Sequence, residues 1–399
     1  MAASRTIVIA GGGIGGLTAA LALAQRGFRA VILEKAERLE EAGAGVQLSP
    51  NASRVLIDLG LEPRLNSVAI TPDAISIMSA QSGGEIARLP LGDAATFRAG
   101  APYWIVHRAD LQSALLAQVR DNSDIELRLG CQFEDAAVHA KGIAVGQRRG
   151  MSRQQETALA LIGADGVWSQ LRHQLFPQTQ PTFSGLIAWR GTIEARQLPR
   201  ELAPRRVQLW MGPNAHLVAY PISGGRRINV VAILPGTWNR PGWSEPGNPN
   251  DINGQFSSRW PGALRMIIRA VDEWRRWALF TIRDGGVWSS GPMALLGDAA
   301  HAMLPFAAQG AGMAIEDAMV LAKCLSENSA DSAAGITASL ERYAGLRRSR
   351  VARVQRHARQ SERIYHLRGP AAYARDLVIK VSSPQWLLSR QDWIYDWRL

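Results

Sequence analysis

The hydrophobic pattern at the start of the chain predicts a strand, a helix and a second strand in close succession. Thr6–Ala10 is a short apolar run suited to a buried strand, and apolar residues then recur at three- and four-residue spacing from Ile14 to Ala24. Gly27 is a suitable stop for this helix, and residues 28–33 form a second apolar run that ends at Glu34. The pattern therefore predicts a β-α-β unit.

Glycines occupy the turn between the first strand and the helix, in the order Gly11-x-Gly13-x-x-Gly16. Gly11 permits a tight turn, Gly13 lets a pyrophosphate approach the backbone, and Gly16 lets the helix pack closely on the strand. The helix start offers free N–H groups and a positive dipole end to phosphates. Glu34 can accept hydrogen bonds from a ribose diol, which favours an adenosine without a 2′-phosphate. An ordinary glycine turn would not require strand, helix, strand and acid in this register, so we interpret the unit as nucleotide-binding.

A glycine-rich loop at residues 43–47 precedes a second predicted helix. Ser49 suits its N-cap, Pro50 its first position and Gly60 its end. The loop either packs on the protein or lies along a cofactor ring.

Residues 103–107 predict a further strand, after which Arg108 leads into a helix for which Asp110 is a candidate cap. Arg108 is either a surface residue or a phosphate contact at a strand end. Further along, residues 159–162 are apolar and are followed by Asp165 between small residues and by a short helix. An acid at a strand end in this setting is typical of a binding crevice.

Alternating strands predict a second domain of a different kind. Residues 74–89 read as a hairpin, and residues 183–234 as strands of a mostly antiparallel sheet, followed by a long connection at residues 235–261. His216 and Tyr220 are four apart in one of these strands, so both side chains should lie on the same face.

A last motif combines a predicted buried strand at residues 293–296, an acid at its end, Asp298, and a long helix that starts at Gly310 and Gly312. Asp298 can hold a second polyol such as a ribityl chain, and the helix start can stabilise negative charge, with the acidic pair Glu316-Asp317 near its first turns. The chain thus offers one site for an adenosine diphosphate and another for what that cofactor carries. A site for NAD would not require the second motif, at Asp298 and the helix that follows it.

Composition limits the alternatives. With 399 residues, 47% of them hydrophobic, the chain can bury a large core and should divide into two domains. No apolar run is long enough to span a bilayer, and the first residues do not resemble a signal peptide, so we expect a cytoplasmic protein without a membrane partner. Cys131 and Cys324 are far apart and show no metal or redox spacing, so no metal site is expected.

The net charge of +11 is almost entirely due to arginine, and much of it lies at residues 342–368. A solvated helix face explains this segment better than a nucleic-acid partner, because no nucleic-acid motif or interleaved stacking aromatic residue is present.

These motifs together resemble the FAD-dependent aromatic hydroxylases, the class A flavoprotein monooxygenases. The chain is similar in particular to the group with salicylate 1-hydroxylase, 3-hydroxybenzoate 6-hydroxylase and 6-hydroxynicotinate 3-monooxygenase. The resemblance runs from about Thr6 to Arg356. It rests on the glycine motif with Glu34, on Asp165 within GADGVWSQLR, and on Asp298 within LLGDAAHAMLPFAAQGAGMAIEDA.

The resemblance implies an α/β fold with a Rossmann-like FAD-binding domain, similar to para-hydroxybenzoate hydroxylase, an inserted, mostly antiparallel β-sheet substrate domain, and C-terminal helices. The expected domains are residues 1–73, 100–180 and 285–345 for FAD, residues 74–99 and 181–284 for substrate, and residues 346–399 as a C-terminal helical segment.

Residue roles follow from the same resemblance. Glu34 would contact the adenosine ribose, Arg108 the phosphates, Asp165 both FAD and NAD(P)H, and Asp298 the ribityl chain and pyrophosphate. Gly310, Ala311 and Gly312 would meet the isoalloxazine near its N1–C2=O edge. The complete set of expected cofactor-binding residues is Gly11, Gly13, Gly15, Gly16, Glu34, Lys35, Val46, Arg108, Asp165, Asp298, Pro305, Gly310, Ala311 and Gly312.

His216 and Tyr220 resemble the active-site pair of the hydroxybenzoate and 6-hydroxynicotinate enzymes. Histidine can remove a proton from a ring hydroxyl near neutral pH, so His216 is the candidate base, with Tyr220 relaying or orienting. The alternative is a histidine held in a sheet for structural reasons. Gln47 stands where the 6-hydroxynicotinate enzyme has a histidine, which argues against the same substrate. The expected substrate contacts are Gln47, His216 and Tyr220.

The expected function is the NAD(P)H- and O2-dependent hydroxylation of a small hydroxylated aromatic or pyridine carboxylate, which the family carries out through a C4a-hydroperoxyflavin. The protein would be a monomer or a homodimer. One alternative is an FAD-dependent epoxidase or other oxidoreductase; the Trp-x-Trp-x-Ile-Pro motif of related halogenases is absent from the sequence. Another is a flavin-binding protein without catalysis.

Overall fold

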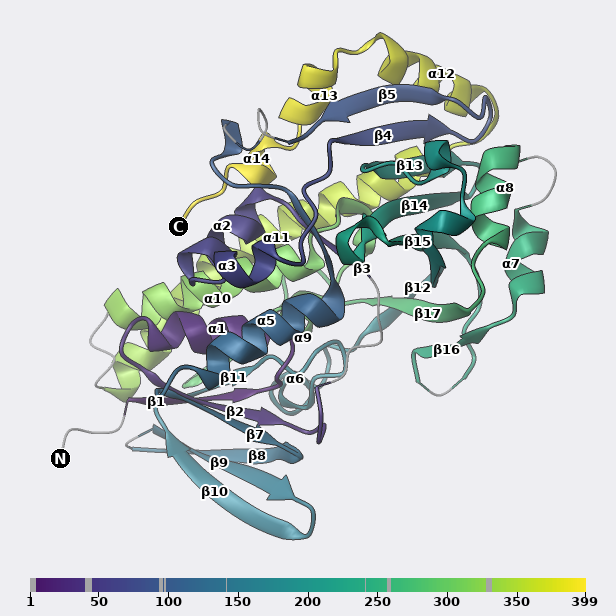
Figure 1. Ribbon diagram of the computed structural model, residues 1–399. Helices are drawn as coiled ribbons and strands as arrows, with labels where there is room; N and C mark the ends of the chain where they lie inside the picture. Colours follow the sequence, from purple (N-terminus) through teal and green to yellow (C-terminus); the bar gives the residue numbers. More distant parts are fainter. Residues whose placement is uncertain are drawn as a thin grey trace.

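Two β-sheets joined by long helices form the frame of the molecule (Figure 1). The computed structural model describes residues 5–39, 45–92, 96, 98–140, 142–240, 242–256, 260–327 and 332–399. None of the helices described over these ranges combines the length and the apolar character that crossing a membrane requires.

The first sheet has six strands in the order β18-β19-β11-β1-β2-β7, and all neighbours are parallel except β18 and β19. The predicted β-α-β unit is confirmed, because β1 and β2 are adjacent and parallel and α1 (Ile14–Ala24) connects them. The strands are β1 Thr6–Ala10, β2 Arg29–Glu34, β7 Ile125–Leu129, β11 Ala160–Gly163, β18 Ser289–Ser290 and β19 Met293–Leu295.

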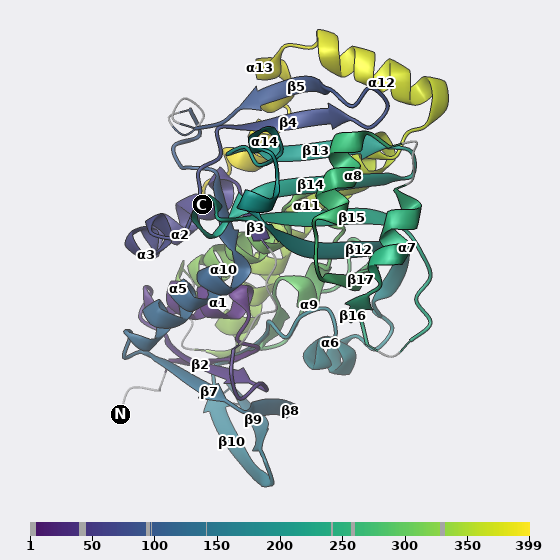
Figure 2. The ribbon, with the colours of Figure 1, turned by 45° about the vertical axis from the view of Figure 1, so that its right-hand side comes forward.

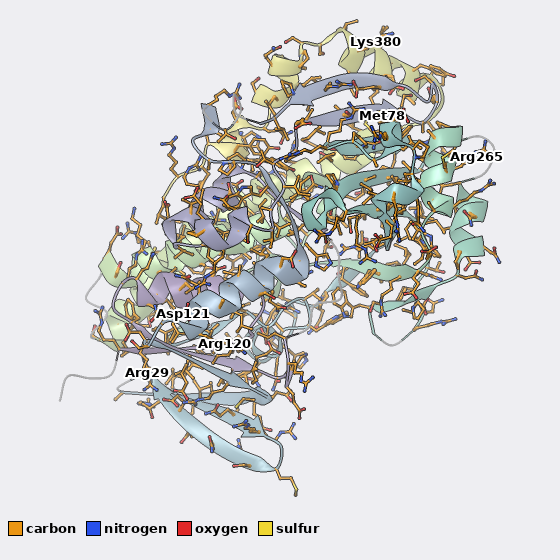
Figure 3. All side chains as sticks on the ribbon, in the orientation of Figure 1. Arg29, Met78, Arg120, Asp121, Arg265 and Lys380 are labelled. Carbon is orange, nitrogen blue, oxygen red and sulfur yellow. The ribbon has the colours of Figure 1, made fainter. Side chains whose placement is uncertain are left out.

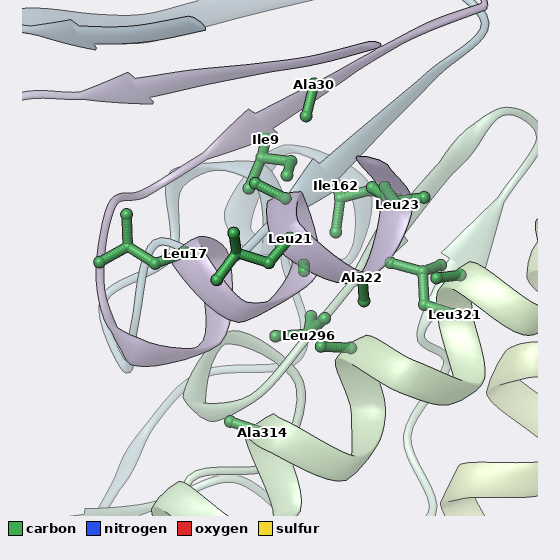
Figure 4. Close-up of a cluster of buried hydrophobic side chains, with 14 of the residues drawn as sticks. Ile9, Leu17, Leu21, Ala22, Leu23, Ala30, Ile162, Leu296, Ala314 and Leu321 are labelled. Carbon is green, nitrogen blue, oxygen red and sulfur yellow. The ribbon is translucent and has the colours of Figure 1, made fainter. Parts of the chain in front are cut away.

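The core of this half lies between the sheet and α10 (Gly310–Glu327), with α1 packed between them (Figure 4). Small residues on α1 allow α10 to approach closely; a Cβ on Gly15 would lie 3.3 Å from Cβ of Ala314 on α10. Each fully buried leucine or isoleucine here contributes about 1.5–3 kcal/mol to stability. The labelled side chains are Ile9, Leu17, Leu21, Ala22, Leu23, Ala30, Ile162, Leu296, Ala314 and Leu321.

The second sheet has eight strands in the order β16-β17-β12-β15-β14-β13-β4-β5, and Figure 2 shows them side by side. The predicted antiparallel character is confirmed, with one parallel pair, β13 and β4. The predicted hairpin is β4 and β5, and it extends this sheet. The strands are β4 Ala74–Ser79, β5 Glu85–Pro90, β12 Thr182–Glu194, β13 Val207–Gly212, β14 Ala215–Ile222, β15 Arg227–Pro235, β16 Ser244–Gly247 and β17 Trp274–Thr281.

Two smaller sheets complete the strands. A pair formed by β3 (Gly45–Leu48) and β6 (Trp104–His107) lies between the large sheets. Three antiparallel strands extend from the nucleotide half: β8 Cys131–His139, β9 Gly142–Arg149 and β10 Ser152–Ala158.

The remaining helices cover both large sheets. On the second sheet, α7 and α8 pack against one face, and the end of α11 with α12 and α13 lies over the other (Figures 1 and 2). They are α2 Pro50–Asp58, α3 Glu62–Asn66, α5 Arg108–Arg120, α6 Gln170–Leu175, α7 Pro249–Gln255, α8 Gly262–Arg269, α9 Asp298–His301, α11 Ala333–Tyr365, α12 Gly369–Val381, α13 Pro384–Ser389, α14 Asp392–Tyr395, and the 3-10 turns η1 Ala195–Gln197, η2 Arg200–Leu202, η3 Ser223–Gly225 and η4 Pro305–Ala307.

Three expectations about helices are corrected. Helix α5 begins at Arg108 with His107 as its N-cap, so Asp110 lies in the first turn and does not cap the helix. Its negative charge still interacts favourably with the positive end of the helix dipole. The connection at residues 235–261 contains β16 and α7. The domain boundary expected at residue 346 falls inside α11, which runs without a break from Ala333 to Tyr365.

The arginine-rich helix is also not solvated throughout. Elsewhere in the chain, charged side chains such as Arg29 on β2 and Lys380 on α12 are exposed (Figure 3). On α11, by contrast, the side chain of Arg347 is only 1% exposed. Its guanidinium donates from Nη1 to Glu316 Oε2 at 2.7 Å and from Nε to Asp317 Oδ1 at 2.6 Å. Arg350, one turn further along α11, donates from Nε to Glu316 Oε2 at 2.6 Å. The acidic pair near the first turns of α10 is therefore neutralised inside the protein by two arginines from α11.

Candidate active site

A cavity of about 320 Å³ lies between the six-stranded and eight-stranded sheets. Its wall combines the turn after β1, the loop before α10 and one face of β12, β14 and β15. The predicted site residues that line it are Gly13, Gly15, Val46, Gln47, Arg108, His216, Tyr220, Asp298, Pro305, Gly310 and Ala311. Distant segments thus converge on one space, whereas Gly43 and Ala44 of the glycine-rich loop lie outside the described residues.

The glycine turn has a geometry in which each glycine is required for a different reason. Gly11 has φ +109°, and a Cβ on it would lie 2.4 Å from the carbonyl oxygen of Ala164. A Cβ on Gly16 would lie 2.0 Å from the carbonyl oxygen of Gly11. A Cβ on Gly13 would meet no atom within 4 Å, so it would project into the open cavity at the N-terminus of α1. Gly11 and Gly16 shape the turn, and Gly13 leaves space over it.

The acids near this turn make local hydrogen bonds. Glu34 accepts from the backbone N–H of Gly12 at 2.7 Å and from that of Ala36 at 2.9 Å, while Lys35 is exposed and away from the cavity wall. Asp165 does not line the cavity either. Its Oδ2 accepts from the backbone N–H of Gln170 at 2.7 Å, at the start of α6, and its buried Oδ1 has no hydrogen-bond partner among the described residues.

The opposite wall is formed by the start of α10 and the loop before it. Gly310 resembles Gly13 in having no atom within 4 Å of a hypothetical Cβ, so the cavity reaches the backbone there too. Gly312, two residues further along α10, is buried, and a Cβ there would lie 3.0 Å from Gln309 Oε1. Asp298 is exposed in the cavity wall and forms no hydrogen bond or ion pair within the described ranges.

These residues fit a dinucleotide that carries a flavin. Two helix N-termini with open backbone, at Gly13 and Gly310, can receive phosphate oxygens and a negatively charged ring edge. The carboxylate of Asp298 and Oδ1 of Asp165 are acceptors without a donor among the described residues, and they suit polyol hydroxyls. Residues of α1, β2 and α10 would hold such a group.

The wall of the cavity toward the eight-stranded sheet includes one face of β14. His216, Val218 and Tyr220 all line the cavity, while the alternate residues Leu217 and Ala219 belong to the core behind the sheet. The predicted sharing of a face by His216 and Tyr220 is confirmed. The Tyr220 hydroxyl donates to the carbonyl oxygen of Gly45 at 2.7 Å, and burial raises its pKa, so it remains protonated.

Sequence reasoning missed His366, the residue that follows α11. Its Nε2 lies 2.9 Å from His216 Nδ1. Burial, and then the proximity of His366, lowers the pKa of His216 well below its ordinary value, and burial lowers that of His366 to about 4. Both rings are therefore neutral near pH 7, as a general base must be.

Arg190 was missed as well, because an arginine in a strand carries no motif by itself. It reaches the cavity from β12, stacks over Trp277 with Cζ 5.3 Å from the ring centroid, and has a buried Nε without a hydrogen-bond partner among the described residues. Among the described residues of the lining, it and Arg108 provide positive charge, and Asp298 is the one carboxylate. The cavity thus favours an anionic ligand.

A buried polar cluster, which sequence reasoning also missed, fixes the start of α10. Asn51 donates from Nδ2 to Glu316 Oε1 at 2.7 Å and to Gln309 Oε1 at 3.1 Å, and Gln309 donates from Nε2 to Ser49 Oγ at 2.8 Å. With Arg347 on the far side of Glu316, three helices are held in one arrangement. This cluster positions Gly310 without contacting the cavity itself.

A second, apolar cavity of about 590 Å³ adjoins the first. It lies between β4, β5 and β13 on one side and the end of α11 with α12 and α13 on the other. The two cavities share Gln47, His216, Val218, Pro305 and Ala308 in their walls. The ring of His216 therefore lies at the boundary between the site and the C-terminal helices.

Comparisons with known proteins agree with this site. Residues 4–358 match the family model described as FAD binding domain. The chain is 34% identical to 3-hydroxybenzoate 6-hydroxylase of Polaromonas naphthalenivorans (strain CJ2), over 100% of this chain and 97% of that protein. It is 35% identical to 3-amino-4-hydroxybenzoate 2-monooxygenase PtmB3 of Streptomyces platensis, over 98% and 95%.

Among solved structures, a salicylate hydroxylase substrate complex superposes with a TM-score of 0.82 at 26% identity, over 99% of this chain and 96% of that one. Both the sequence and the fold match along nearly the whole chain. The chain therefore belongs to the FAD binding domain family and, within it, to the class A flavoprotein monooxygenases.

Proposed function

We propose that this enzyme hydroxylates a small aromatic ring that bears a hydroxyl and a carboxylate, with FAD in the cavity, NADH or NADPH as reductant and O2 as oxidant. One observation carries the proposal: the neutral His216 and the half-buried Arg190 face the same space as the two open helix N-termini. The relatives named above act on hydroxybenzoates or an aminohydroxybenzoate, which supports this substrate class.

Bound FAD would supply the redox chemistry, accepting hydride from the nicotinamide and activating O2 for insertion of one oxygen atom into the ring. The residues that would hold it are Gly13, Glu34 and Asp298, together with Arg108 for the phosphates and Gly310 and Ala311 for the ring.

The sheet residues act on the substrate. His216 accepts the proton of the ring hydroxyl, and the resulting phenolate is a stronger carbon nucleophile than the phenol. Arg190 provides the counter-charge for the carboxylate. Tyr220, fixed by its bond to Gly45, orients the ring from the same strand.

The apolar residues of the wall exclude water. Val218, Val231 and Ile233 line the sheet side of the cavity, and Ile14, Leu296 and Ala314 lie on the opposite side. A dry site favours oxygen transfer to the ring over loss of the oxidising equivalent as peroxide.

The test is a screen of hydroxybenzoates, aminohydroxybenzoates and hydroxypyridine carboxylates, each paired with the matched phenol that lacks the carboxylate. NAD(P)H oxidation, oxygen uptake and product identity are measured together. The proposal predicts that the carboxylates stimulate NAD(P)H oxidation and give a hydroxylated product. The matched phenols without a carboxylate should stimulate NAD(P)H oxidation much less. Stimulation without any hydroxylated product from any compound would contradict it.

A further inference from the structure

The unexplained feature of the site is the second histidine. His216 is 2% exposed, in the middle of a wall that excludes water, whereas His366 is half-buried at the end of α11. The two rings are joined edge to edge by the contact of 2.9 Å between Nδ1 of His216 and Nε2 of His366. A base buried at this depth needs a route by which the abstracted proton can leave.

We propose that His216 and His366 form a two-histidine proton relay that carries the proton of the substrate hydroxyl from the cavity to solvent. The inference rests on the proposed function, because it assumes that a ring hydroxyl is deprotonated in the cavity.

The proton balance is simple. In the resting tautomer, His216 Nδ1–H donates to His366 Nε2, which leaves the lone pair of His216 Nε2 for the substrate. The hydroxyl proton moves to His216 Nε2, the Nδ1 proton moves to His366 Nε2, and the Nδ1 proton of His366 passes to water. One proton leaves the phenol, one enters the solvent, and both rings end neutral.

The surroundings favour this arrangement over two independent histidines. Phe306 packs on both rings, with centroid distances of 4.7 Å to His216 and 5.5 Å to His366, so neither ring is free to turn away. The backbone also fixes His366: its N–H donates to the carbonyl oxygen of Glu362, and its carbonyl oxygen accepts from the N–H of Asn214.

The dipole of α11 favours proton transfer from His216 toward His366. The C-terminal end of the 33-residue α11 carries a partial negative charge, which favours transient protonation of His366 over His216. Other titratable groups around the pair do not provide an alternative acceptor: Tyr365 faces His216 from α11 with a pKa raised by burial, and Tyr220 has its proton engaged with Gly45. Charged neighbours among the described residues include Arg190 on β12, Glu362 and Arg363 on the last turn of α11, Arg368 after it, and Arg375 on α12, which donates to the carbonyl oxygen of Tyr365 at 3.2 Å.

The first arm of the test reads the protons directly. In protein labelled with 15N-histidine, long-range 1H–15N NMR assigns the tautomers, using His216→Gln and His366→Gln to identify the signals. The relay predicts His216 protonated on Nδ1 and unprotonated on Nε2. Protonation of His216 on Nε2 in the neutral ring would overturn it, because that nitrogen could not then accept the substrate proton.

The second arm uses turnover with 3-hydroxybenzoate as the probe. His366→Gln keeps the size and polarity of the side chain but cannot transfer a proton. It should lower kcat for hydroxylation at least about tenfold, at the low end of general-base effects, with KM little changed. It should leave the rate of flavin reduction unchanged. Imidazole added to His366→Ala should restore part of kcat, which a purely structural role would not permit.

His357→Gln is the matched control, since His357 is a half-buried histidine on the same helix that contacts Trp393 instead of His216. It should behave as wild type. Wild-type kcat in His366→Gln, with hydroxylation intact, would overturn the relay alone. Absence of hydroxylation in the wild-type enzyme would count against the proposed function, and the tautomers would still decide the arrangement of the pair.

Discussion

The hydroxyl of Tyr220, on the eight-stranded sheet, donates a 2.7 Å hydrogen bond to the carbonyl oxygen of Gly45, the first residue of β3. A Cβ on Gly45 would lie 2.3 Å from Cε2 of the same tyrosine. The two residues therefore fit together only because position 45 has no side chain. This contact fixes one edge of the ligand cavity, which both residues line.

Gly45→Ala should therefore displace Tyr220 and lower kcat/KM for the aromatic substrate by about tenfold or more, corresponding to a loss of roughly 1.4 kcal/mol in transition-state binding. Gly254→Ala, in α7 where a Cβ meets nothing within 4 Å, is the control and should leave turnover unchanged. Steady-state kinetics of the two variants decide the matter; equal values would mean that the contact has no role in the site.

Gly13→Val tests the cofactor side. Because the space over Gly13 is open in the protein, the variant should fold, but its side chain would occupy the position expected for the pyrophosphate. We expect FAD affinity to fall by at least about 100-fold, or roughly 2.7 kcal/mol. Flavin absorbance after purification and titration of the apoprotein measure this, with far-UV circular dichroism as the check on folding. A variant with full flavin occupancy would refute the assignment.

Arg347→Met should destabilise the fold without altering the cavity wall. It leaves the buried Asp317 without an arginine partner, while Glu316 keeps its pair with Arg350, and breaking a buried pair such as Arg347–Asp317 costs about 3–5 kcal/mol. Arg342→Met, on the same helix, removes an exposed pair with Glu327 and should change stability by no more than about 1 kcal/mol. Denaturant unfolding of both apoproteins gives the comparison. Similar unfolding midpoints would show that the buried cluster contributes little.

The histidine pair should make stability depend on pH. Burial lowers the pKa of both rings, that of His366 to about 4, so the unfolded chain binds more protons than the folded one below about pH 6.5. Stability is therefore greatest above that value and decreases as pH falls toward 4. His366→Gln should show a smaller decrease in Tm than wild type between about pH 7 and pH 5.

At about pH 8, where both histidines are neutral in either state, the difference in Tm between wild type and His366→Gln should be constant with pH. Parallel curves over the whole range would mean that His366 does not titrate with a lowered pKa.

The sequence was informative where function depends on local pattern. The turn at Gly11, Gly13 and Gly16 lies between adjacent elements, and the shared face of His216 and Tyr220 follows from the two-residue period of a strand. These features need no knowledge of the distant chain.

Other features depend on contacts between distant segments. His366 lies 150 residues from its partner His216, and Arg347 lies about 30 residues from its two acids on a different helix. His366 and Arg347 both belong to the arginine-rich segment at residues 342–368, whose composition predicts a solvated helix face. Only the packing of the helices shows which of its positions are buried. The start of α5 was misplaced for a related reason, since an acid in a first turn and an acid at an N-cap give similar patterns.

The most direct test of the account is the origin of the oxygen in the product. Purified protein, reconstituted with FAD and supplied with NAD(P)H and an aromatic carboxylate that stimulates its oxidation, should be run under 18O2. We predict a hydroxylated product that carries one 18O atom, formed in step with NAD(P)H consumption. A product labelled only from H2 18O, or complete conversion of the reducing equivalents to hydrogen peroxide with every stimulating compound, would contradict the claim that this cavity hydroxylates an aromatic ring.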